Sequence, residues 1–349
     1  MPSRRVVLGY AIPRSLARAT RSCQPRAMIA LETIAETIPL PPTPKGWFDY
    51  GYAALADRRL ALIRTRKDVH AEQARWWEAV NAGDRWRPSP PPPLWDGDMR
   101  LSIFDGTAES DGVTVPSIAH PIVDQTADGR WLVAGSRADP REKNARIHAA
   151  DGRIEQRMAL GDGIQGLSCS PDGTIWVGYF DEGVFGDRNK DGSWPVSSGG
   201  IVQFDAAGTP LWSFNAQVAE GRRIDDAYAM TLSGTDLWAC YYSGFPIVRI
   251  RDGKRTFWSN HVAGASAIAV KDGLVLLGGG YGDDANRMTL VRLDRRSSRE
   301  LGRIELPVAV GSASLMQGRG SVMHLVRGGI WTRLAVHDAA AAIGVERGD

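Results

Sequence analysis

The chain has 349 residues, of which 43% are hydrophobic and 23% are charged, a composition typical of a soluble globular protein with a sizeable core. No apolar run approaches the roughly 18 residues of a membrane-spanning helix, so no membrane association is expected. The formal net charge of +2 includes six arginines and no acid within residues 1–27. The rest of the chain therefore carries −4, and nucleic-acid binding is not expected.

Residues 1–27 are expected to form a disordered basic leader, or to precede a true start at Met28. Their stretch SRRVVL is similar to a twin-arginine signal, but arginines interrupt the apolar run that should follow it. The three cysteines, Cys23, Cys169 and Cys240, are too widely spaced for a disulfide framework or a zinc site. Because the last two lie in apolar strand-like runs, we expect free thiols in a reducing, cytoplasmic compartment.

Four segments share one plan, in which a tight glycine turn precedes an alternating apolar strand. They are TADGRWLVAG (126–135), SPDGTIWVGY (170–179), LSGTDLWACY (232–241) and VKDGLVLLGG (270–279). Trp131, Trp176 and Trp238 fall at nearly the same place after the turn, and we expect them to pack against a neighbouring repeat. A second module of strand, short turn and strand follows each segment, so the repeating unit contains four short strands.

Four strands in each stretch of about 40–50 residues, without a long helix, are typical of a β-propeller blade. The units number six. The first spans residues 47–117, and the others begin near Ala119, Gly163, Arg222, Gly264 and Val308. The last unit supplies only three strands, so the N-terminal run MIALETIAETIPL (28–40) is expected to add the fourth. Closing the ring in this way would pair strand edges that are otherwise exposed.

The sequence thus resembles the six-bladed β-propeller superfamily over about residues 28–338, and the predicted fold class is all-β with four-stranded blades. The resemblance rests on blade spacing and on the DG turns, which indicate a fold and say little about function. It implies a single propeller domain, with a helical and proline-rich insertion at 66–97 and a C-terminal tail at 339–349. The protein is expected to be a monomer.

Propeller topology sorts the connections onto two faces. With the strands of a blade named A to D from the axis outwards, the A–B and C–D turns share one face, called here the short-turn face. The B–C loops and the D-to-A crossovers share the other, called here the looped face. The long connections are B–C loops, at 65–97, 137–144, 180–199 and 279–287. A small molecule or a protein is therefore expected to bind at the looped face.

Polar and aromatic residues at the strand ends converge on the axial mouth of the looped face. The candidate ligand-binding residues are His120, Gln165, Tyr179, Asp181, Glu182, Asp225, Asp226, Tyr241, Tyr242, Tyr281, Asp283 and Arg327. The favoured function is a non-enzymatic propeller that binds a ligand or a protein, because no complete catalytic motif is present. The alternative is a metal-dependent hydrolase, lactonase or lyase with an axial acidic and histidine site.

The segment DRNKDG in the third long loop matches the start of a calcium-binding loop. Asp187, Asn189 and Asp191 can present side-chain oxygens, and Ser193 can present its backbone carbonyl. The glutamate required at the twelfth position is replaced by Ser198, and Asx-rich turns are common in loops that bind no metal. Calcium is therefore a candidate cofactor, and an unliganded surface loop is the alternative.

Overall fold

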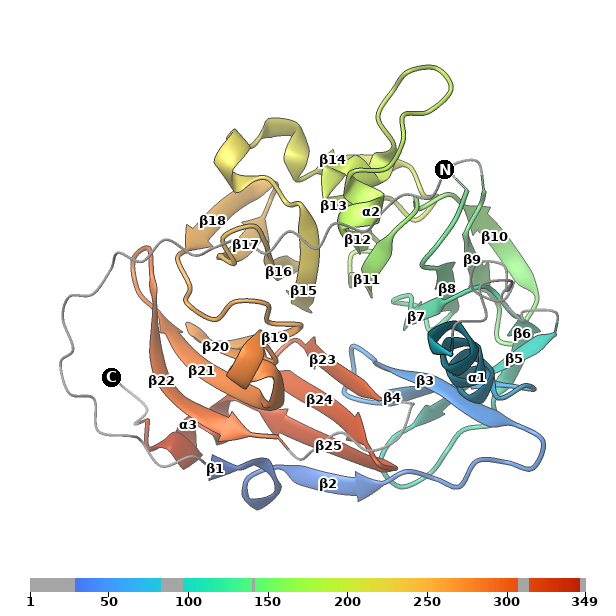
Figure 1. Cartoon of the computed structure of the whole chain (residues 1–349), viewed down its shortest axis with the longest axis horizontal. Helices are drawn as coiled ribbons and strands as arrows, with labels where there is room; N and C mark the ends of the chain where they lie inside the picture. The colour runs from blue at the N-terminus through green and yellow to red at the C-terminus, as the bar shows by residue number, and fades with distance from the viewer. Residues whose placement is uncertain (1–28, 83–96, 140–141, 307–313, 346–349) are drawn as a thin grey trace.

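The structure is a computed structural model, and it describes residues 29–82, 97–139, 142–306 and 314–345. Six sheets stand around a common axis in a ring (Figure 1). Five of them have four strands, and the sheet of the fifth blade has a fifth strand. The predicted all-β, six-bladed propeller is therefore confirmed. No described helix is both long enough and apolar enough to cross a membrane.

The first three blades are antiparallel meanders whose strands follow one another along the chain. Their strands are β3 (Phe48–Ala54), β4 (Leu60–Thr65), β5 (Asp98–Phe104) and β6 (Val113–Pro116) in the first blade; β7 (Pro121–Gln125), β8 (Trp131–Gly135), β9 (Ala145–His148) and β10 (Ile154–Met158) in the second; and β11 (Ile164–Cys169), β12 (Ile175–Tyr179), β13 (Ile201–Phe204) and β14 (Pro210–Ser213) in the third.

The other three blades follow the same plan, and the last takes its outermost strand from the N-terminal region. Their strands are β15 (Asp226–Ser233), β16 (Asp236–Tyr242), β17 (Ile247–Arg251) and β18 (Lys254–Trp258) in the fourth blade; β19 (Ala267–Lys271), β20 (Leu274–Gly278), β21 (Arg287–Leu293) and β22 (Ser298–Glu305) in the fifth; and β23 (Leu315–Arg319), β24 (Val322–Arg327), β25 (Ile330–Ala335) and β2 (Glu36–Pro39) in the sixth.

The apolar core is divided among six clusters, and each cluster fills the interface between two neighbouring blades. Because side chains alternate along a strand, one strand contributes to two interfaces. Trp176 and Trp238 face the following blade, whereas Trp131 faces the preceding one. All three are buried, as expected, but Trp131 lies one position earlier in strand B. It pairs with Gln125 of strand A as Ile175 pairs with Cys169, and a one-residue offset reverses the face of a strand.

The glycine turns that revealed the repeat are held by local hydrogen bonds. In the third blade, the carboxylate of Asp172 accepts hydrogen bonds from the backbone N–H and the hydroxyl of Thr174, at 3.0 and 2.7 Å. Gly173 follows with a φ of +85°, a conformation that residues with a side chain rarely adopt. The sequence DG is therefore required by the backbone of the A–B turn.

The N-terminal strap, defined here as residues 29–40, closes the ring. Its strand β2 pairs with β25, and both carboxylate oxygens of Glu36 accept hydrogen bonds from Arg333, at 2.7 and 2.9 Å. The predicted closure is confirmed. The strap also contains β1 (Ile29–Ala30), which pairs in parallel with β22 of the fifth blade. The sequence placed the whole strap in the sixth blade, whereas the structure divides it between two blades, with Leu31 buried between them.

Helices occur only as short additions to the described ring. They are α1 (Val69–Asn81), α2 (Asp181–Val184), α3 (Val336–Ile343), and the 3-10 helices η1 (Leu31–Thr33), η2 (Val196–Gly199), η3 (Asn215–Gln217), η4 (Glu220–Arg222) and η5 (Gly282–Asn286). The helix α1 lies in the first B–C loop, where Asp68 caps it by accepting the Ala71 N–H at 2.9 Å. The proline run of that loop lies outside the described residues. The helix α3 packs against the fifth and sixth blades through Ala339 and Ala340.

Candidate functional site

An axial cavity of about 230 Å³ lies between the inner strands, and all six blades contribute to its wall. Its polar and sulfur-containing lining consists of Tyr52, Gln165, Ser168, Tyr228, Met230, Ser266, Met316 and Gln317. Gln165 and Ser266, at the looped-face end, are exposed, whereas Ser168, nearer the short-turn face, is buried. The cavity therefore opens on the looped face, where the sequence predicted the functional mouth.

A buried ion pair lies at the closed end of the cavity. Arg319 of β23 donates to Asp124 of β7 at 2.7 Å and to Ser168 of β11 at 3.0 Å. The side chains of Arg319 and Asp124 are 4% and 2% exposed. The Cys169 N–H also donates to Asp124, at 2.8 Å. These groups link the sixth blade to the second and third across the axis, so this floor cluster, Asp124, Ser168 and Arg319, stabilises the ring.

Two cavity residues reach the axis through β-bulges. The ladder between strands A and B shifts register near the looped-face end of β3, β11 and β15, where Tyr50, Gln165 and Tyr228 are the additional residues. A bulge re-aims the side chain of the inserted residue, and Gln165 and Tyr228 both line the cavity. Tyr228 was not among the sequence candidates, because strand alternation alone gives no sign of a bulge.

Two candidate residues lie away from the mouth. Tyr179 and Tyr241 are fully buried in the clusters between the second and third and between the third and fourth blades. The Tyr179 hydroxyl donates to the Leu160 carbonyl, and the Tyr241 hydroxyl donates to the Arg222 carbonyl at 2.9 Å. Both tyrosines lie near the end of strand B, and both side chains point into the core. Their hydroxyl groups therefore bond to backbone carbonyls inside the protein and do not face the axis.

An ion-pair cluster occupies the mouth between the second and third blades. Arg137 pairs with Glu182 and, at 3.1 Å, with Asp162. The pKa of His120 is lowered by partial burial of its ring and by the positive charge of Arg137. The structure therefore places Glu182 and His120 beside an arginine, an arrangement that neutralises the carboxylate and disfavours a charged imidazole.

A second group of acids lies between the third and fourth blades. Asp181 opens α2, Asp226 opens β15, and α2 packs against β15. Burial and the negative charge of Asp181 raise the pKa of Asp226 to about 6. Asp225 precedes Asp226, and its N–H donates to the Tyr242 carbonyl at 2.8 Å. The structure thus brings three of the predicted acids to one sector of the mouth.

Aromatic rings border this acidic sector. Tyr281 lies 6.1 Å from Tyr228 and 5.5 Å from Phe245, measured between ring centroids, and the hydroxyl groups of the two tyrosines hydrogen-bond to each other. Tyr242 lies 5.6 Å from Phe245. Phe245, like Tyr228, was missing from the sequence candidates, because it follows strand B in an irregular turn. Two predicted tyrosines and two unpredicted aromatic residues therefore form one wall.

The remaining candidates lie apart from this wall. Asp283 is exposed in η5 of the fifth blade. Arg327 ends strand B of the sixth blade, and burial lowers its pKa. Within the described residues, no three His, Cys, Asp or Glu side chains come close enough to hold one metal ion. The metal-dependent hydrolase, lactonase or lyase stays an alternative predicted from the sequence.

The calcium-like segment of the 180–199 loop forms a turn closed by its own hydrogen bonds. The Asp191 carboxylate accepts the N–H and the hydroxyl of Ser193, at 2.9 and 2.6 Å. The side-chain amide of Asn189 donates to the Ser193 hydroxyl at 2.9 Å. The backbone N–H of Asn189 donates to the backbone carbonyl of Ser193, also at 2.9 Å. Three of the four proposed ligands thus bond to one another. Calcium binding by Asp187, Asn189, Asp191 and Ser193 stays a prediction from the sequence.

Exposed aromatic side chains gather on the looped face. Six of them have at least two-fifths of their surface exposed, namely Phe48, Trp77, Phe185, Trp194, Tyr242 and Tyr281. Each lies in a B–C loop or at the looped-face end of strand A or B. On the short-turn face, the described residues present none. The most exposed aromatic side chains of the described residues are thus confined to the looped face.

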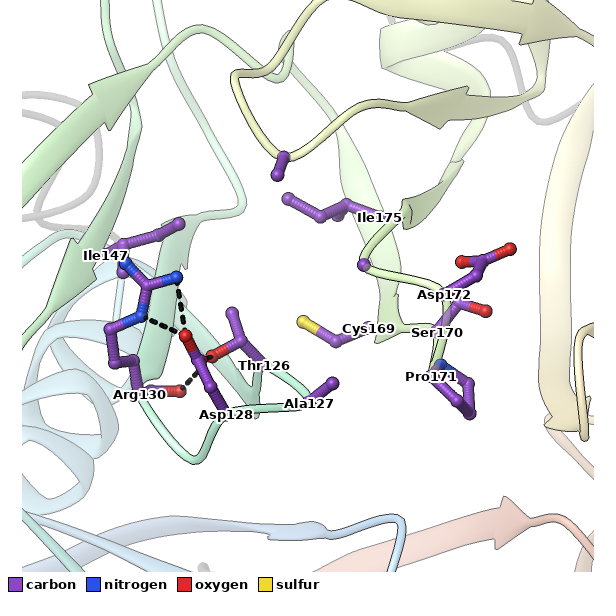
Figure 2. Close-up of a pocket in the computed structure, with 12 residues that line it drawn as sticks. Thr126, Ala127, Asp128, Arg130, Ile147, Cys169, Ser170, Pro171, Asp172 and Ile175 are labelled. Atoms are coloured by element: carbon purple, nitrogen blue, oxygen red, sulfur yellow. Dashed lines mark hydrogen bonds and ion pairs between the residues drawn. The ribbon is translucent and has the colours of Figure 1, made fainter.

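Two hollows of about 280 and 300 Å³ lie on the short-turn face, among the A–B turns of the first three blades. Figure 2 shows the first, with the Cys169 sulfur pointing into it between the turns of the second and third blades. Burial and the charge of Asp124 raise the pKa of this thiol, so it is a poor nucleophile. Asp128 bonds to Arg130 and Thr126 at the rim, so these polar groups are already paired (Figure 2).

No family model matches the chain, and no curated protein matches it. Among solved structures, 374 chains match. One is a gluconolactonase from Xanthomonas campestris, 16% identical, with 86% of this chain and 97% of that chain covered and a TM-score of 0.42. Another belongs to a mitotic checkpoint complex, 11% identical, with 96% and 99% covered and a TM-score of 0.45. These likenesses carry no argument about activity.

Proposed function

We propose that the protein is a non-enzymatic binding propeller, which takes a small-molecule ligand at the looped-face mouth of its axial cavity. The observation that carries this proposal is the distribution of exposed aromatic side chains. All six that the described residues present lie on the face where the cavity opens. A ligand seated there would contact inner strands that the blade interfaces hold rigid.

The lining of the cavity suits recognition of a small polar molecule. Tyr228 supplies a ring, whereas Gln165 and Ser266 supply hydrogen-bonding groups at the entrance. Pockets that bind small molecules commonly combine an apolar wall with a few such groups.

A ligand screen with looped-face variants tests this proposal. Ligand-observed NMR on a metabolite library should identify compounds that bind the wild type. The double variant Tyr242→Ser with Tyr281→Ser should lose them, because it removes two exposed rings at the mouth. Leu211→Ser is the matched control, since it removes an exposed apolar side chain outside the mouth and should retain binding.

Two results would count against the proposal. Compounds that bind both variants as tightly as the wild type would place the site elsewhere. Conversion of a bound compound into a product, followed in the same NMR samples over time, would show an enzyme and favour the hydrolase, lactonase or lyase alternative.

A further inference from the structure

The sector of the cavity wall between the third and fourth blades combines acids with aromatic rings. Tyr228 and Met230 of β15 line the axial cavity, and Asp226 is the half-buried first residue of the same strand, at its looped-face end. Asp181 approaches the same strand from α2. Burial, the Tyr281 hydroxyl and both carboxylates raise the pKa of Tyr228, which agrees with their proximity.

The carboxylate of Asp226 lacks a compensating partner. It is half-buried, and within the described part of the chain it makes no hydrogen bond and no ion pair. The charge that acts on it comes from another acid, Asp181, whose own carboxylate accepts the N–H of Glu182 at 2.8 Å. Two carboxylates in one sector, without a basic partner among the described residues, attract a positive charge.

The aromatic wall beside the acids favours a particular kind of cation. Tyr228, Phe245 and Tyr281 lie within 5.5 to 6.1 Å of one another, measured between ring centroids. Aromatic faces attract cations, and organic ammonium groups most readily, because the ring also contacts their carbon atoms. Calcium takes six to eight oxygen ligands, so two carboxylates beside aromatic rings suit an organic cation better than calcium.

We propose, on the basis of the binding function above, that the ligand is a small organic cation whose ammonium group lies between Asp226 and Asp181 and against the ring of Tyr228. The cavity of about 230 Å³ takes the rest of the molecule. Gln165 and Ser266, at the entrance, are placed to bond to its polar substituents. Recognition thus combines a charge interaction with an aromatic contact, at one sector of the mouth.

A pair of probes that differ only in charge tests the inference. Choline carries a quaternary ammonium group, and 3,3-dimethylbutan-1-ol has the same shape without the charge. Titrations followed by NMR at pH 7.5 should show choline binding about tenfold more tightly than the alcohol. Asp226→Asn should abolish this difference, and Tyr228→Leu should reduce it. Asp252→Asn, which removes a negative charge from a turn on the short-turn face, should preserve it.

The pH dependence supplies a second readout. At this end of β15 the neighbouring titratable groups are Asp181 on α2, Asp225 in the crossover, and the tyrosines Tyr228 and Tyr242. Burial and the hydrogen bond to Tyr281 raise the pKa of Tyr228, so its hydroxyl stays protonated in this range. Choline binding should weaken as the pH falls below about 6, where Asp226 takes up a proton, and binding of the alcohol should not change.

The outcomes separate this inference from the proposed function. Equal binding of the two probes, unchanged choline binding in Asp226→Asn, or no detectable choline binding would overturn the organic-cation inference. If the metabolite screen nevertheless finds neutral or anionic compounds that Tyr242→Ser with Tyr281→Ser loses, the looped-face binding function stands. If the screen finds compounds that bind elsewhere, both proposals fail.

Discussion

The buried pair of Arg319 and Asp124 makes a prediction about single residues. Replacing Arg319 with methionine leaves Asp124 charged in the interior without its partner, so the free energy of unfolding should fall by about 3–5 kcal/mol. Urea denaturation measures the change. Arg59→Met is the matched control, because Arg59 pairs with Asp57 at the exposed surface and its loss should cost less than about 1 kcal/mol.

A double variant separates the effect of the unpaired charge from the effect of lost packing. Removing both charges, with Arg319→Met and Asp124→Asn together, should restore part of the lost stability, because no uncompensated charge then stays buried. If the single and double variants were equally unstable, packing at the axis and not charge would explain the loss.

His324 predicts how stability depends on pH. Burial, and then nearby arginines led by Arg333, lower the pKa of its ring from 6.5 to about 3. The unfolded chain therefore takes up the proton first as the pH falls, so this stability is complete above pH 6.5 and is lost below it. When the pH is lowered from 7 to 4.5, the free energy of unfolding of the wild type should fall by roughly 2–3 kcal/mol more than that of His324→Phe.

Urea midpoints at the two pH values measure this difference. The Nδ1 atom of His324 accepts the indole N–H of Trp331 at 3.3 Å, so the phenylalanine variant should be less stable at pH 7. The prediction is tested by how the free energy of unfolding changes with pH, and not by the difference between the two proteins at pH 7. His337→Phe is the control at an exposed histidine, and an equal effect there would contradict the assignment.

Individual site residues were predictable only where strand ends reach the axis directly. Asp181 and Asp226 could be placed at the mouth because the blade pattern fixes where strand A begins and strand B ends. Gln165 was named from its place in the crossover, and it reaches the axis through a bulge that the sequence does not show. Tyr179 and Tyr241 have the same kind of position in the sequence, yet they lie in the core, because side-chain direction depends on the local pairing register. Tyr228 was missed for a related reason, since its bulge depends on the partner strand.

At the scale of elements, the N-terminal strap predicts two contrasting truncations. Removing residues 1–27 should leave the melting temperature unchanged, because the strap is retained. Removing residues through Leu40 should lower it strongly, because β25 loses its partner and the edge is exposed. Burial of Leu31 alone contributes about 1.5–3 kcal/mol.

Differential scanning calorimetry on both proteins measures the contrast. If the longer truncation fails to fold, Leu31→Ala in the full chain supplies the same test, with an expected cost of about 2–5 kcal/mol. Identical melting temperatures for the two truncated proteins would contradict closure by the strap.

Elements were the most predictable level of the structure. The blades expected near Ala119, Gly163 and Gly264 begin at Pro121, Ile164 and Ala267, because glycine turns and alternating apolar strands are local signals. The parallel pairing of β1 with β22 was not predicted, since two residues carry no periodicity and their partner lies at the other end of the chain.

For the whole molecule, the six interfaces predict a single cooperative unit. Each blade shares a cluster with both neighbours, and the floor cluster links three blades, so no interface separates the ring into independent halves. Unfolding curves from tryptophan fluorescence and far-ultraviolet circular dichroism should coincide. Limited proteolysis that yields two stable fragments, split near Leu160 between the second and third blades, would show the opposite.

The strap also sets the order of events when the protein is made. Glu36 and its partner Arg333 are separated by 297 positions, so the ribosome delivers Glu36 well before Arg333. At 5–20 residues per second, the interval is roughly 15–60 s. During that interval strand β2 has no partner, because β25 has not yet been made. Leu31 and Ile38 therefore lack their packing partners from the fifth and sixth blades until those blades have been made.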